Sequence, residues 1–455
     1  MDKLHEECGV FGIYSPAGEQ VSHNIYSGLT ALQHRGQESA GMALSDTEGP
    51  MGNIVMKKGM GLVSEVFSGK DLAELGGNIG VGHVRYSTTG ESRVENAQPI
   101  AMNYIKGSLA LVHNGNITNA GELKEKQMHR GQAHYTTTDS EVLAYEIVSK
   151  RVRCGTIEEA VAKVAGIMKG GFACLVMSPR KLIGFRDPLG LKPLILGKKG
   201  AAYIFASESA AILSIGGELI RDVRPGEIIT VTEDGITSDT SLCKKRAAHC
   251  IFEYIYFARN DSVIDGISVH DARFEAGRAL AKEEVPDADI VAGVPDSGLV
   301  AAEGYADASK IPFGLIFHKN SYIGRSFIKP TDEERKNAVH MKLSVIKSVV
   351  EGKRIVLIDD SIVRGNTMRQ IIIMLRQAGA KEVHVRISSP PFLYPCYYGT
   401  DVPSAKQLIA SEHSAAEICK NIGADSLRYL EVRDFKKMVG TLPLCRACFD
   451  GHYPV

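Results

Sequence analysis

The residues best suited to chemistry in the second half of the chain lie at positions 355–367, Ile-Val-Leu-Ile-Asp-Asp-Ser-Ile-Val-Arg-Gly-Asn-Thr. An apolar run there ends in Asp359 and Asp360, and a loop with hydroxyls and Gly365 leads into a helical pattern. Loop amides and a helix N-terminus offer donors to a phosphate, and adjacent carboxylates suit ribose hydroxyls or a hydrated Mg²⁺ ion. An isolated Asp-Asp pair is more often a helix cap. The complete order of strand, acids, hydroxyl, glycine and threonine favours a site for a phosphorylated ribose.

A second reactive set surrounds Cys8, which stands just before an apolar, strand-like run. A lone cysteine near a terminus rarely has a chemical role, so the case depends on polar residues elsewhere in the first half. These are Arg35 in the Gln33–Ser39 cluster, Arg85 in a strand-like run, Asn114 and Gly115 at a turn after an apolar strand, and Asp139 at a helix start.

Together these residue types match what hydrolysis of the glutamine side-chain amide requires. A thiolate attacks the amide carbon, and a base takes the thiol proton and returns it to the leaving ammonia. A terminal α-amine, with a pKa of about 7.7–8.0, suits that role at neutral pH. Asn114 and the Gly115 N–H could hold the oxyanion. Arg85 offers a bidentate fork to the substrate carboxylate, and Asp139 offers an acceptor to its ammonium group.

The nine cysteines include a C-x-x-C pair, Cys445 and Cys448, near the C-terminus. On its own this spacing supports zinc, an iron–sulfur cluster or a redox pair about equally. A four-ligand site needs two more thiolates, and spacing does not choose among the candidates. The candidates are Cys154, Cys174, Cys243, Cys250, Cys396 and Cys419.

Length, charge and hydropathy limit the classes of protein that could carry these sites. The chain has 455 residues, which predicts about two to four domains. Lys plus Arg and Asp plus Glu both number 53, which argues against non-specific binding to nucleic acid or acidic membranes. No apolar run reaches the roughly 20 residues of a membrane-spanning helix, and the polar stretch 1–7 is not a secretory signal. We therefore expect a cytoplasmic protein with reduced thiols.

The elements that must position these residues change in character along the chain. The first half has short strand-like segments with interleaved helical patterns, for example at 140–152. The second half has continuous apolar runs such as 354–358, each followed by a polar turn and a helical pattern, which is typical of parallel strands with crossover helices. We place the boundary in the stretch 235–248. The expected fold is a two-domain α/β protein with domains at residues 8–240 and 241–455.

The 355–367 motif resembles the motif that binds 5-phosphoribosyl 1-diphosphate (PRPP) in the type I phosphoribosyltransferases. The resemblance implies an α/β domain with a mainly parallel sheet, in which Ser297, Asp359 and Asp360 hold Mg²⁺. It also implies a loop that closes over the substrate and neutralises the leaving diphosphate. The residues implied to bind PRPP are Asp359, Asp360, Ser361, Arg364, Gly365, Asn366, Thr367, Lys319, Arg325 and Lys342.

The motifs of the first half resemble the class II, or N-terminal nucleophile, glutamine amidotransferases over about residues 8–235. That resemblance implies an αββα sandwich. In that family the nucleophile is the first residue of the mature chain, because its own α-amine is the base. Residues Met1–Glu7 are therefore implied to be a propeptide that is removed before Cys8. The implied catalytic residues are Cys8, Asn114 and Gly115, and the implied glutamine-binding residues are Arg85, Asp139 and Arg35.

Both halves together resemble the glutamine-dependent phosphoribosyltransferases of purine synthesis, in the branch with a propeptide and a [4Fe–4S] cluster. The resemblance implies that PRPP, glutamine and water give 5-phosphoribosylamine, diphosphate and glutamate. It further implies a homotetramer that purine nucleotides inhibit. The implied cluster ligands are Cys250, Cys396, Cys445 and Cys448, with zinc as the alternative.

Two other functions compete with this interpretation. One is a PRPP-sensing regulator without catalysis, which needs no glutaminase, whereas this chain carries a full glutaminase set. The other is an amidotransferase acting on a hexose phosphate, and the 355–367 motif argues against it.

Overall fold

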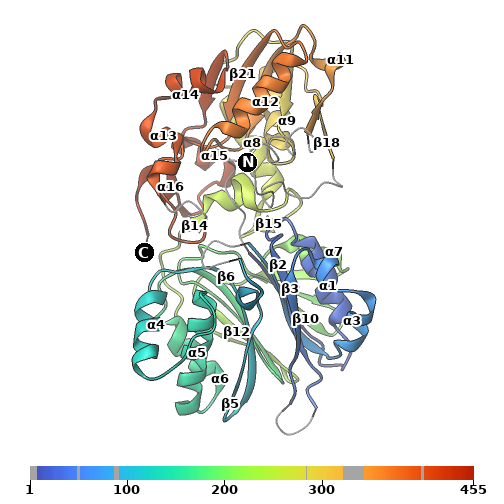
Figure 1. Cartoon of the computed structure of the whole chain (residues 1–455), viewed down its shortest axis with the longest axis vertical. Coiled ribbons are helices and arrows are strands. Elements are labelled where there is room, and N and C mark those ends of the chain that lie inside the picture. Colours follow the sequence, from blue (N-terminus) through green and yellow to red (C-terminus); the bar gives the residue numbers. More distant parts are fainter. Residues whose placement is uncertain are drawn as a thin grey trace.

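Two stacked antiparallel β-sheets form the middle of the first half of the chain, in the lower body of Figure 1. The structure is a computed structural model, and it describes residues 8–48, 52–86, 92–282, 284–320, 343–400 and 404–454. Among these residues, the first sheet has seven strands in the order β11 (Glu218–Asp222), β9 (Ile195–Lys199), β10 (Ala202–Ala206), β1 (Gly9–Tyr14), β4 (Ile79–Arg85), β2 (Ser39–Ser45) and β3 (Val55–Met60). The second has six described strands in the order β13 (Gly235–Asp239), β12 (Ile228–Thr232), β8 (Lys181–Arg186), β7 (Gly170–Ser178), β6 (Gly107–Ile117) and β5 (Ile100–Tyr104).

The central strands of these sheets read as continuous apolar runs because both of their faces are buried. β1 and β4 are buried along their whole length. Val10, Val81 and Val112 belong to the core between the two sheets. Helices cover the outer faces, so the layers follow the expected αββα order (Figure 1). The helices on the first sheet are α1 (Ser22–Ala31), α2 (Val63–Val66), α3 (Gly69–Glu74) and α7 (Ser209–Ser214), and those by the second are α4 (Ala120–His129), α5 (Asp139–Arg153) and α6 (Ile157–Ala165).

A parallel sheet forms the centre of the second half, in the upper body of Figure 1. Ile355 and Leu357 of its strand β20 face one hydrophobic cluster, and Val356 and Ile358 face another. This alternation follows from the two-residue period of a strand and requires helices on both faces. The expected parallel α/β domain is therefore confirmed. The strand order is β17 (Ile290–Gly293), β20 (Arg354–Asp359), β21 (Glu382–Ile387) and β22 (Ser426–Tyr429), and the flanking helices are α8 (Val269–Leu280), α9 (Ser297–Ser309), α12 (Asn366–Gln377) and α14 (Ala415–Ile422).

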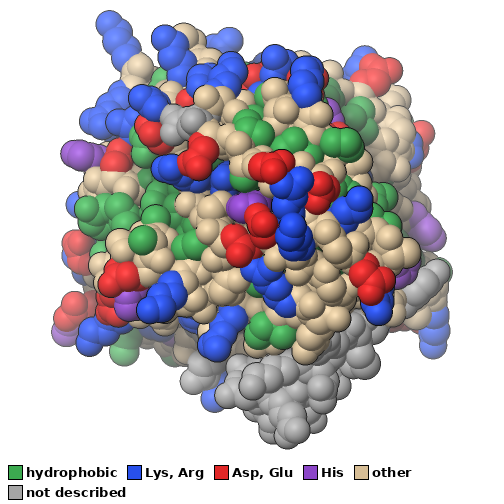
Figure 2. Space-filling view, turned by 90° about the horizontal axis from the view of Figure 1, so that it is seen from above, with side chains coloured by type: hydrophobic (Ala, Val, Ile, Leu, Met, Phe, Trp, Pro, Cys, Tyr) green, Lys and Arg blue, Asp and Glu red, His purple; other side chains and the backbone are tan. Residues whose placement is uncertain are grey.

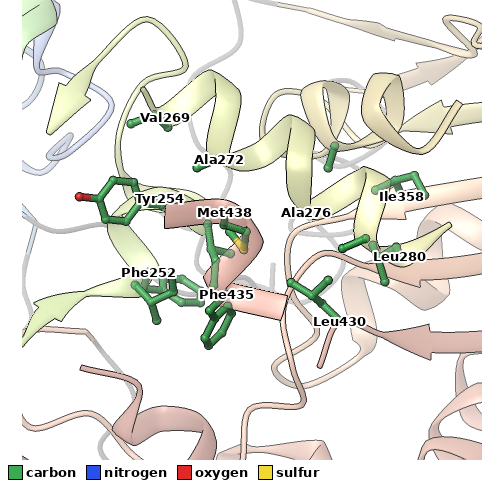
Figure 3. Packing of buried hydrophobic residues seen from close by; sticks show 14 of the residues in the cluster. Phe252, Tyr254, Val269, Ala272, Ala276, Leu280, Ile358, Leu430, Phe435 and Met438 are labelled. Atoms are coloured by element: carbon green, nitrogen blue, oxygen red, sulfur yellow. The ribbon is translucent and has the colours of Figure 1, made fainter. Parts of the chain in front are cut away.

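The segment that connects the two halves belongs to the core of the second half. Figure 3 shows Phe252 and Tyr254 of this segment beside Phe435 and Met438 of the short helix α15 (Phe435–Val439). These side chains share one buried cluster with the inner face of α8. The connecting segment also contains a π-helical turn, η2 (Glu253–Phe257). The C-terminal part of the chain therefore packs on the residues that lead out of the glutaminase-like half.

Short elements complete the described structure. β14 (His249–Cys250) pairs in parallel with β23 (Leu444–Cys445), which places two cysteines side by side. The expected domain boundary between residues 240 and 241 falls between β13 and β14 and stays a prediction. The remaining short elements are β15 (Val263–Ile264), β16 (Ile267–Ser268), β18 (Phe317–Lys319), β19 (Leu343–Val345), α11 (Lys347–Val350), α13 (Ile409–Glu412), α16 (Ala447–Asp450), η1 (Val94–Asn96), η4 (Ala405–Gln407) and η5 (Val432–Asp434).

The surface over the end of the second half carries charges of both signs. Figure 2 looks onto this end and shows Lys and Arg side chains interspersed with Asp and Glu. This mixture agrees with the equal totals of 53 basic and 53 acidic residues. Among the described residues, no helix has the length and apolar character needed to cross a membrane.

Candidate active sites and the cysteine cavity

Cys8 lies at the open start of β1, in the middle of the first sheet. Gly9 pairs with Val84 of β4, so Cys8 stands beside the end of that strand. The Cys8 thiol is half-buried, and its Sγ lies 3.5 Å from the Tyr86 carbonyl oxygen, to which it donates. The thiol therefore lies at the end of a central strand and is partly accessible from outside the sheet.

Asn114 and Gly115 lie in β6 of the second sheet, which packs against β1 and β4. The turn expected at these two residues is wrong, because pairing with β7 keeps them inside the strand. Asn114 is fully buried, and among the described residues neither its Nδ2 nor its Oδ1 has a hydrogen-bond partner. An unsatisfied buried amide is costly, and such groups are found where a ligand supplies the missing partner. Gly115 has a φ of +137°, a conformation that favours glycine. The role of Asn114 and Gly115 as oxyanion donors stays a prediction.

Arg85 and Asp139 enter the same region from β4 and from the N-terminus of α5. Arg85 is 3% exposed, and its Nη1 donates to Glu38 at 2.7 Å. Asp139 Oδ2 accepts from the Ile117 N–H at 2.9 Å, which ties α5 to β6. Burial raises the pKa of the Asp139 carboxyl, but His113 and the backbone hydrogen bonds outweigh burial and hold it below its ordinary value. Asp139 is therefore ionised at neutral pH, as an acceptor for an ammonium group must be.

Arg35 is fully buried and supports Cys8 through the main chain. Its Nε donates to the Cys8 carbonyl oxygen at 3.1 Å, and its other nitrogens donate to Glu208 and Glu253 at 2.7–2.9 Å. Burial raises the pKa of the Glu208 carboxyl, but His34 and Arg35 hold it well below its ordinary range. Direct binding of glutamine by Arg35 stays a prediction.

Glu208 and Glu253 were not singled out from the sequence. Glu208 follows the apolar run of β10 and is itself fully buried. An acid next to such a run needs a cation, and this is the signal that could have identified it as a partner of Arg35. Asn116, which contacts the second half of the chain, was missed for another reason: its partner is 281 positions away.

The acidic pair at the end of β20 meets Ser297 at the carboxyl edge of the parallel sheet. Asp359 and Asp360 are nearly fully buried. Asp360 accepts from the hydroxyls of Ser297, at 2.5 Å, and of Ser361, at 2.6 Å. Burial raises the pKa of Tyr256 in η2 well above its ordinary value, and the charges of Asp360 and Asp359 raise it further. The structure therefore brings Ser297 next to Asp360 and Ser361, as the sequence predicted.

The loop after these acids leads into α12, as expected for a phosphate site. Gly365 stands at the start of α12 with a φ of +84°, and a helix N-terminus presents backbone N–H groups that suit an anion. Asn366 and Thr367 form the first turn, and Arg364 is exposed and donates to Gln407 at 2.6 Å. The sequence order of the motif therefore corresponds to a continuous loop and helix start.

The cations expected in the closing loop are only partly described. Lys319 lies in β18 and forms an ion pair with Asp296, next to Ser297. This position is close to the acidic pair. Arg325 and Lys342 lie outside the described residues.

Four cysteines line one cavity between the two halves of the chain. They are the same four that the resemblance implied: Cys250, Cys396, Cys445 and Cys448. Lys192 of the first half also lines this cavity. Within the described part of the chain, no three His, Cys, Asp or Glu side chains are gathered closely enough to hold one metal ion as they stand. The four thiols thus share the cavity walls without meeting around one point.

The chemistry of these thiols fits a cationic group. Burial raises the pKa of the Cys448 thiol well above its ordinary value, and the three other cysteines raise it further. Burial also raises the pKa of Cys445 to about 12, although Lys192 opposes the shift. Because the buried Cys445 and Cys448 thiols resist ionisation, a bound metal that supplies positive charge would favour their thiolate forms.

Comparison with known proteins matches this two-part architecture. A glutamine amidotransferase domain model matches residues 83–214, and a phosphoribosyl transferase domain model matches residues 265–388. An amidophosphoribosyltransferase of Bacillus subtilis is 46% identical, over 99% of this chain and 94% of the relative. One of Methanocaldococcus jannaschii is also 46% identical, over 98% of this chain and 97% of the relative. The chain belongs to the amidophosphoribosyltransferase family.

Solved structures of amidophosphoribosyltransferases agree with this assignment. The Bacillus subtilis glutamine PRPP amidotransferase complexed with ADP and GMP has a TM-score of 0.90 at 45% identity and covers 98% of this chain and 97% of that one. The structure of the allosteric regulatory enzyme of purine biosynthesis has a TM-score of 0.91 at 45% identity and covers 98% of this chain and 96% of that one. The chain is therefore a glycosyltransferase that uses glutamine and PRPP in the first step of purine biosynthesis, and it fits the Bacillus-type branch.

Proposed function

We propose that Cys8 hydrolyses glutamine in the domain 8–240, and that the domain 241–455 uses the released ammonia to aminate PRPP. The observation that carries the glutaminase assignment is the buried Asn114 amide, which has no partner among the described residues although it lies in a strand packed against β1. A donor left unsatisfied in this position is explained by a transient oxyanion.

The first half-reaction depends on removal of residues 1–7, which lie outside the described part of the chain. Once Cys8 is the first residue, its α-amine takes the thiol proton while Sγ attacks the amide carbon of glutamine. Asn114 Nδ2 and the Gly115 N–H stabilise the oxyanion, and ammonia leaves with a proton from the amine. Water then cleaves the thioester and releases glutamate. Arg85 binds the substrate carboxylate and Asp139 its ammonium group.

The second half-reaction takes place at the carboxyl edge of the parallel sheet. Asp359 and Asp360 would hold Mg²⁺ with Ser297, and Mg²⁺ would neutralise diphosphate charge. The 5-phosphate binds at the loop and the start of α12, which contain Ser361, Arg364, Gly365, Asn366 and Thr367. Ammonia attacks C1 of the ribose, and the C1–O bond breaks so that diphosphate leaves with the electron pair. Lys319, together with Arg325 and Lys342, stabilises the leaving diphosphate.

Ammonia passes between the two sites inside the protein in this proposal. The support is the position of η2 between them. Glu253 of η2 binds Arg35, which donates to the Cys8 carbonyl oxygen. Ile255 and Phe257 of the same turn belong to one buried hydrophobic cluster with Ile358, the residue before Asp359. This helical turn therefore joins the support of Cys8 to the cluster beneath the acidic pair.

The four cysteines would hold a [4Fe–4S] cluster in the cavity between the halves, with zinc as the alternative. Neither half-reaction transfers electrons, so the group supplies structural cross-links rather than redox chemistry. The support is that the four cysteines line one cavity, and that burial and the three other cysteines raise the pKa of the Cys448 thiol. Metal analysis decides between the two: about four irons per chain agree with the cluster, whereas colourless protein with one zinc per chain contradicts it.

Regulation and assembly are proposed from the relatives. The Bacillus subtilis structure was solved with ADP and GMP, so we expect purine nucleotides to inhibit this chain. We also expect a homotetramer located in the cytoplasm. Sedimentation of the purified enzyme with and without GMP tests the oligomer, and a species smaller than a tetramer under both conditions would contradict it.

The function is tested by two measurements on anaerobically purified enzyme. N-terminal sequencing shows whether the mature chain begins at Cys8, and an assay follows PRPP-dependent release of glutamate. Cys8→Ala should abolish glutamate release but retain amination of PRPP with ammonium chloride as the nitrogen donor, because only the thiol is lost. Glutamate release unaffected by Cys8→Ala would exclude the proposed nucleophile.

A further inference from the structure

Residues 395–400 of the phosphoribosyltransferase half contact the strand of the glutaminase half that carries the oxyanion residues. The Asn116 Nδ2 donates to the Tyr397 carbonyl oxygen at 2.8 Å, across 281 positions of sequence. Asn116 follows Gly115 directly in β6. A hydrogen bond to the phosphoribosyltransferase half thus starts one residue after Gly115 of the glutaminase half.

Close packing of main chain reinforces this hydrogen bond. Gly399 has a φ of +124°, and a Cβ placed there would lie 3.4 Å from Gly115 Cα and 2.9 Å from Lys192 Nζ. Gly171, the partner of Asn116 in β7, would bring a Cβ to 3.4 Å from Tyr398 Cβ. The 395–400 segment therefore packs close to both β6 and β7 where these strands pair at Gly115 and Asn116.

Gly115 itself is confined by its neighbours. A Cβ on Gly115 would lie 2.0 Å from the Gly171 carbonyl oxygen, so β7 approaches it as closely as a glycine allows. A Cβ on Gly399, in the other half of the chain, would lie 3.4 Å from Gly115 Cα. Gly115, at its φ of +137°, thus lies between β7 and the 395–400 segment.

The position of the 395–400 segment depends in turn on the cysteine cavity. Cys396 lines this cavity, and the Tyr398 N–H donates to its Sγ at 3.4 Å. The Tyr453 hydroxyl donates to the Pro395 carbonyl oxygen at 2.6 Å, and its ring packs against Tyr397 at 4.9 Å between centroids. These contacts of the segment therefore lie either on residues 115–116 of β6 or on the walls of the cavity.

We propose that the metal centre held by the four cysteines positions Asn114 and Gly115 of β6 through residues 395–400, with Asn116 as a positioning residue. This inference rests on the proposed roles of Cys8, Asn114 and Gly115 and on a metal centre in the cavity. Its consequence is that loss of the metal lowers turnover of glutamine specifically. A centre that only fastened the C-terminal tail would not act on β6.

Hydrogen–deuterium exchange gives a readout that is independent of activity. Exchange is compared between the holoenzyme and the enzyme after oxidative loss of the metal centre, in peptides that cover 109–117 of β6 and 100–104 of the adjacent β5. We expect faster exchange in β6 after metal loss and unchanged exchange in β5. Equal exchange of β6 in both forms would overturn the proposal.

Variants that retain the metal centre test the same contact without removing it. Asn116→Ala should lower kcat for glutamine hydrolysis roughly 10- to 100-fold, less than the loss of a direct oxyanion donor. KM for glutamine should be nearly unchanged, because the contact acts in the transition state. Amination of PRPP with ammonium chloride and the iron content should be retained. Asn103→Ala, an exposed asparagine of β5, is the matched control.

A glycine pair supplies a second comparison. Gly399→Ala and Gly216→Ala both place a side chain at a positive φ, but only the new Cβ at 399 meets other atoms, since nothing lies within 4 Å of that at 216. Gly399→Ala should reproduce the selective loss of glutamine turnover, and Gly216→Ala should not. Equal loss of glutamine- and ammonia-dependent activity in Asn116→Ala, or no loss at all, would overturn the proposal.

The outcomes separate this inference from the function on which it rests. If the unaltered enzyme releases no glutamate in the presence of PRPP, the proposed function fails. If the unaltered enzyme is active and Asn116→Ala behaves like Asn103→Ala, only the positioning role is wrong.

Discussion

At the scale of single residues, the two reaction centres differ in how their polar groups are satisfied. In the phosphoribosyltransferase site, Asp360 is saturated by hydroxyls from Ser297 and Ser361. In the glutaminase site, the Asn114 amide has no partner among the described residues. The acidic pair is thus held by hydrogen bonds within its own site, whereas the Asn114 side chain is left without one. Substitutions at the two sites should therefore have separable effects.

Asn114→Ala should lower kcat for glutamine hydrolysis by about 10²–10³-fold, because one oxyanion donor is lost. Ammonia-dependent amination of PRPP should be retained, since the second site is untouched. Steady-state assays with glutamine and with ammonium chloride measure both activities. A comparable loss with both nitrogen donors would show that Asn114 acts on the fold rather than on the oxyanion.

Asp359→Asn should have the complementary pattern. Removing one buried carboxylate at the end of β20 weakens Mg²⁺ binding, so turnover with glutamine and with ammonia should both fall, roughly 10²-fold or more. Raising the magnesium concentration should restore part of the activity. Retained ammonia-dependent turnover at ordinary magnesium concentration would contradict the assignment of Asp359.

At the scale of elements, glycines decide how closely helices and strands approach in the second half. A Cβ at Gly277 of α8 would lie 1.8 Å from the Ala301 carbonyl oxygen of α9, and one at Gly304 of α9 would lie 2.0 Å from the Phe274 carbonyl oxygen of α8. The two helices thus cross with backbones in contact. This crossing places α9 so that Ser297 at its N-terminus reaches Asp360.

Gly277→Ala should destabilise the protein by about 1–3 kcal/mol or more, because the added methyl overpacks a backbone contact. Gly121→Ala in α4 is the matched control: it has nothing within 4 Å and should stabilise a helix by up to about 1 kcal/mol. Urea unfolding of both variants measures the difference. Equal stability of the two variants would contradict the close crossing of α8 and α9.

At the scale of the whole molecule, buried ion pairs join the two halves at two places. Arg35 of the first half binds Glu253 of η2, and Glu208 accepts from the Arg259 N–H and the Ser262 hydroxyl. On another side, Arg186 binds Asp265 through two hydrogen bonds at 2.7 and 2.8 Å. Because these pairs are desolvated, removing one partner leaves an uncompensated buried charge. The relative position of the two sites therefore depends on these networks as well as on the cysteine cavity.

Glu208→Gln should lower the free energy of unfolding by about 3–5 kcal/mol at pH 7. The folded pKa of Glu208 lies below its unfolded value of about 4.3, so the stabilisation is fully present above that pH and is lost as the pH falls toward the folded pKa. Denaturant unfolding between pH 7 and pH 3 should therefore show a difference that is constant at first and narrows below about pH 4. The exposed Glu233→Gln is the control. A difference that grows on acidification would contradict the sign of the shift.

The local motifs and layer order of this protein follow from its sequence alone. Strand patterns with buried faces and the acidic pair before Gly365 are encoded in neighbouring residues, because hydrophobic period and turn chemistry act over a few positions. The turn predicted at Asn114 and Gly115 was wrong, since pairing with β7 keeps both residues in strand β6. The helical pattern at 140–152 corresponds to α5 (Asp139–Arg153). The motifs were sufficient for a resemblance to known families, and that resemblance implied the fold class.

Only the tertiary structure decided which distant residues meet. Spacing left six cysteines as candidates beside Cys445 and Cys448, and the fold brings Cys250 and Cys396 to the same cavity. No local pattern could predict that Arg35 binds Glu208 and Glu253, or that Asn116 donates to Tyr397, since a buried charge or amide is satisfied by whatever the packing of separate elements places beside it. The physical reason is that short-range periodicity specifies elements, whereas contacts between elements depend on how their faces fit in three dimensions.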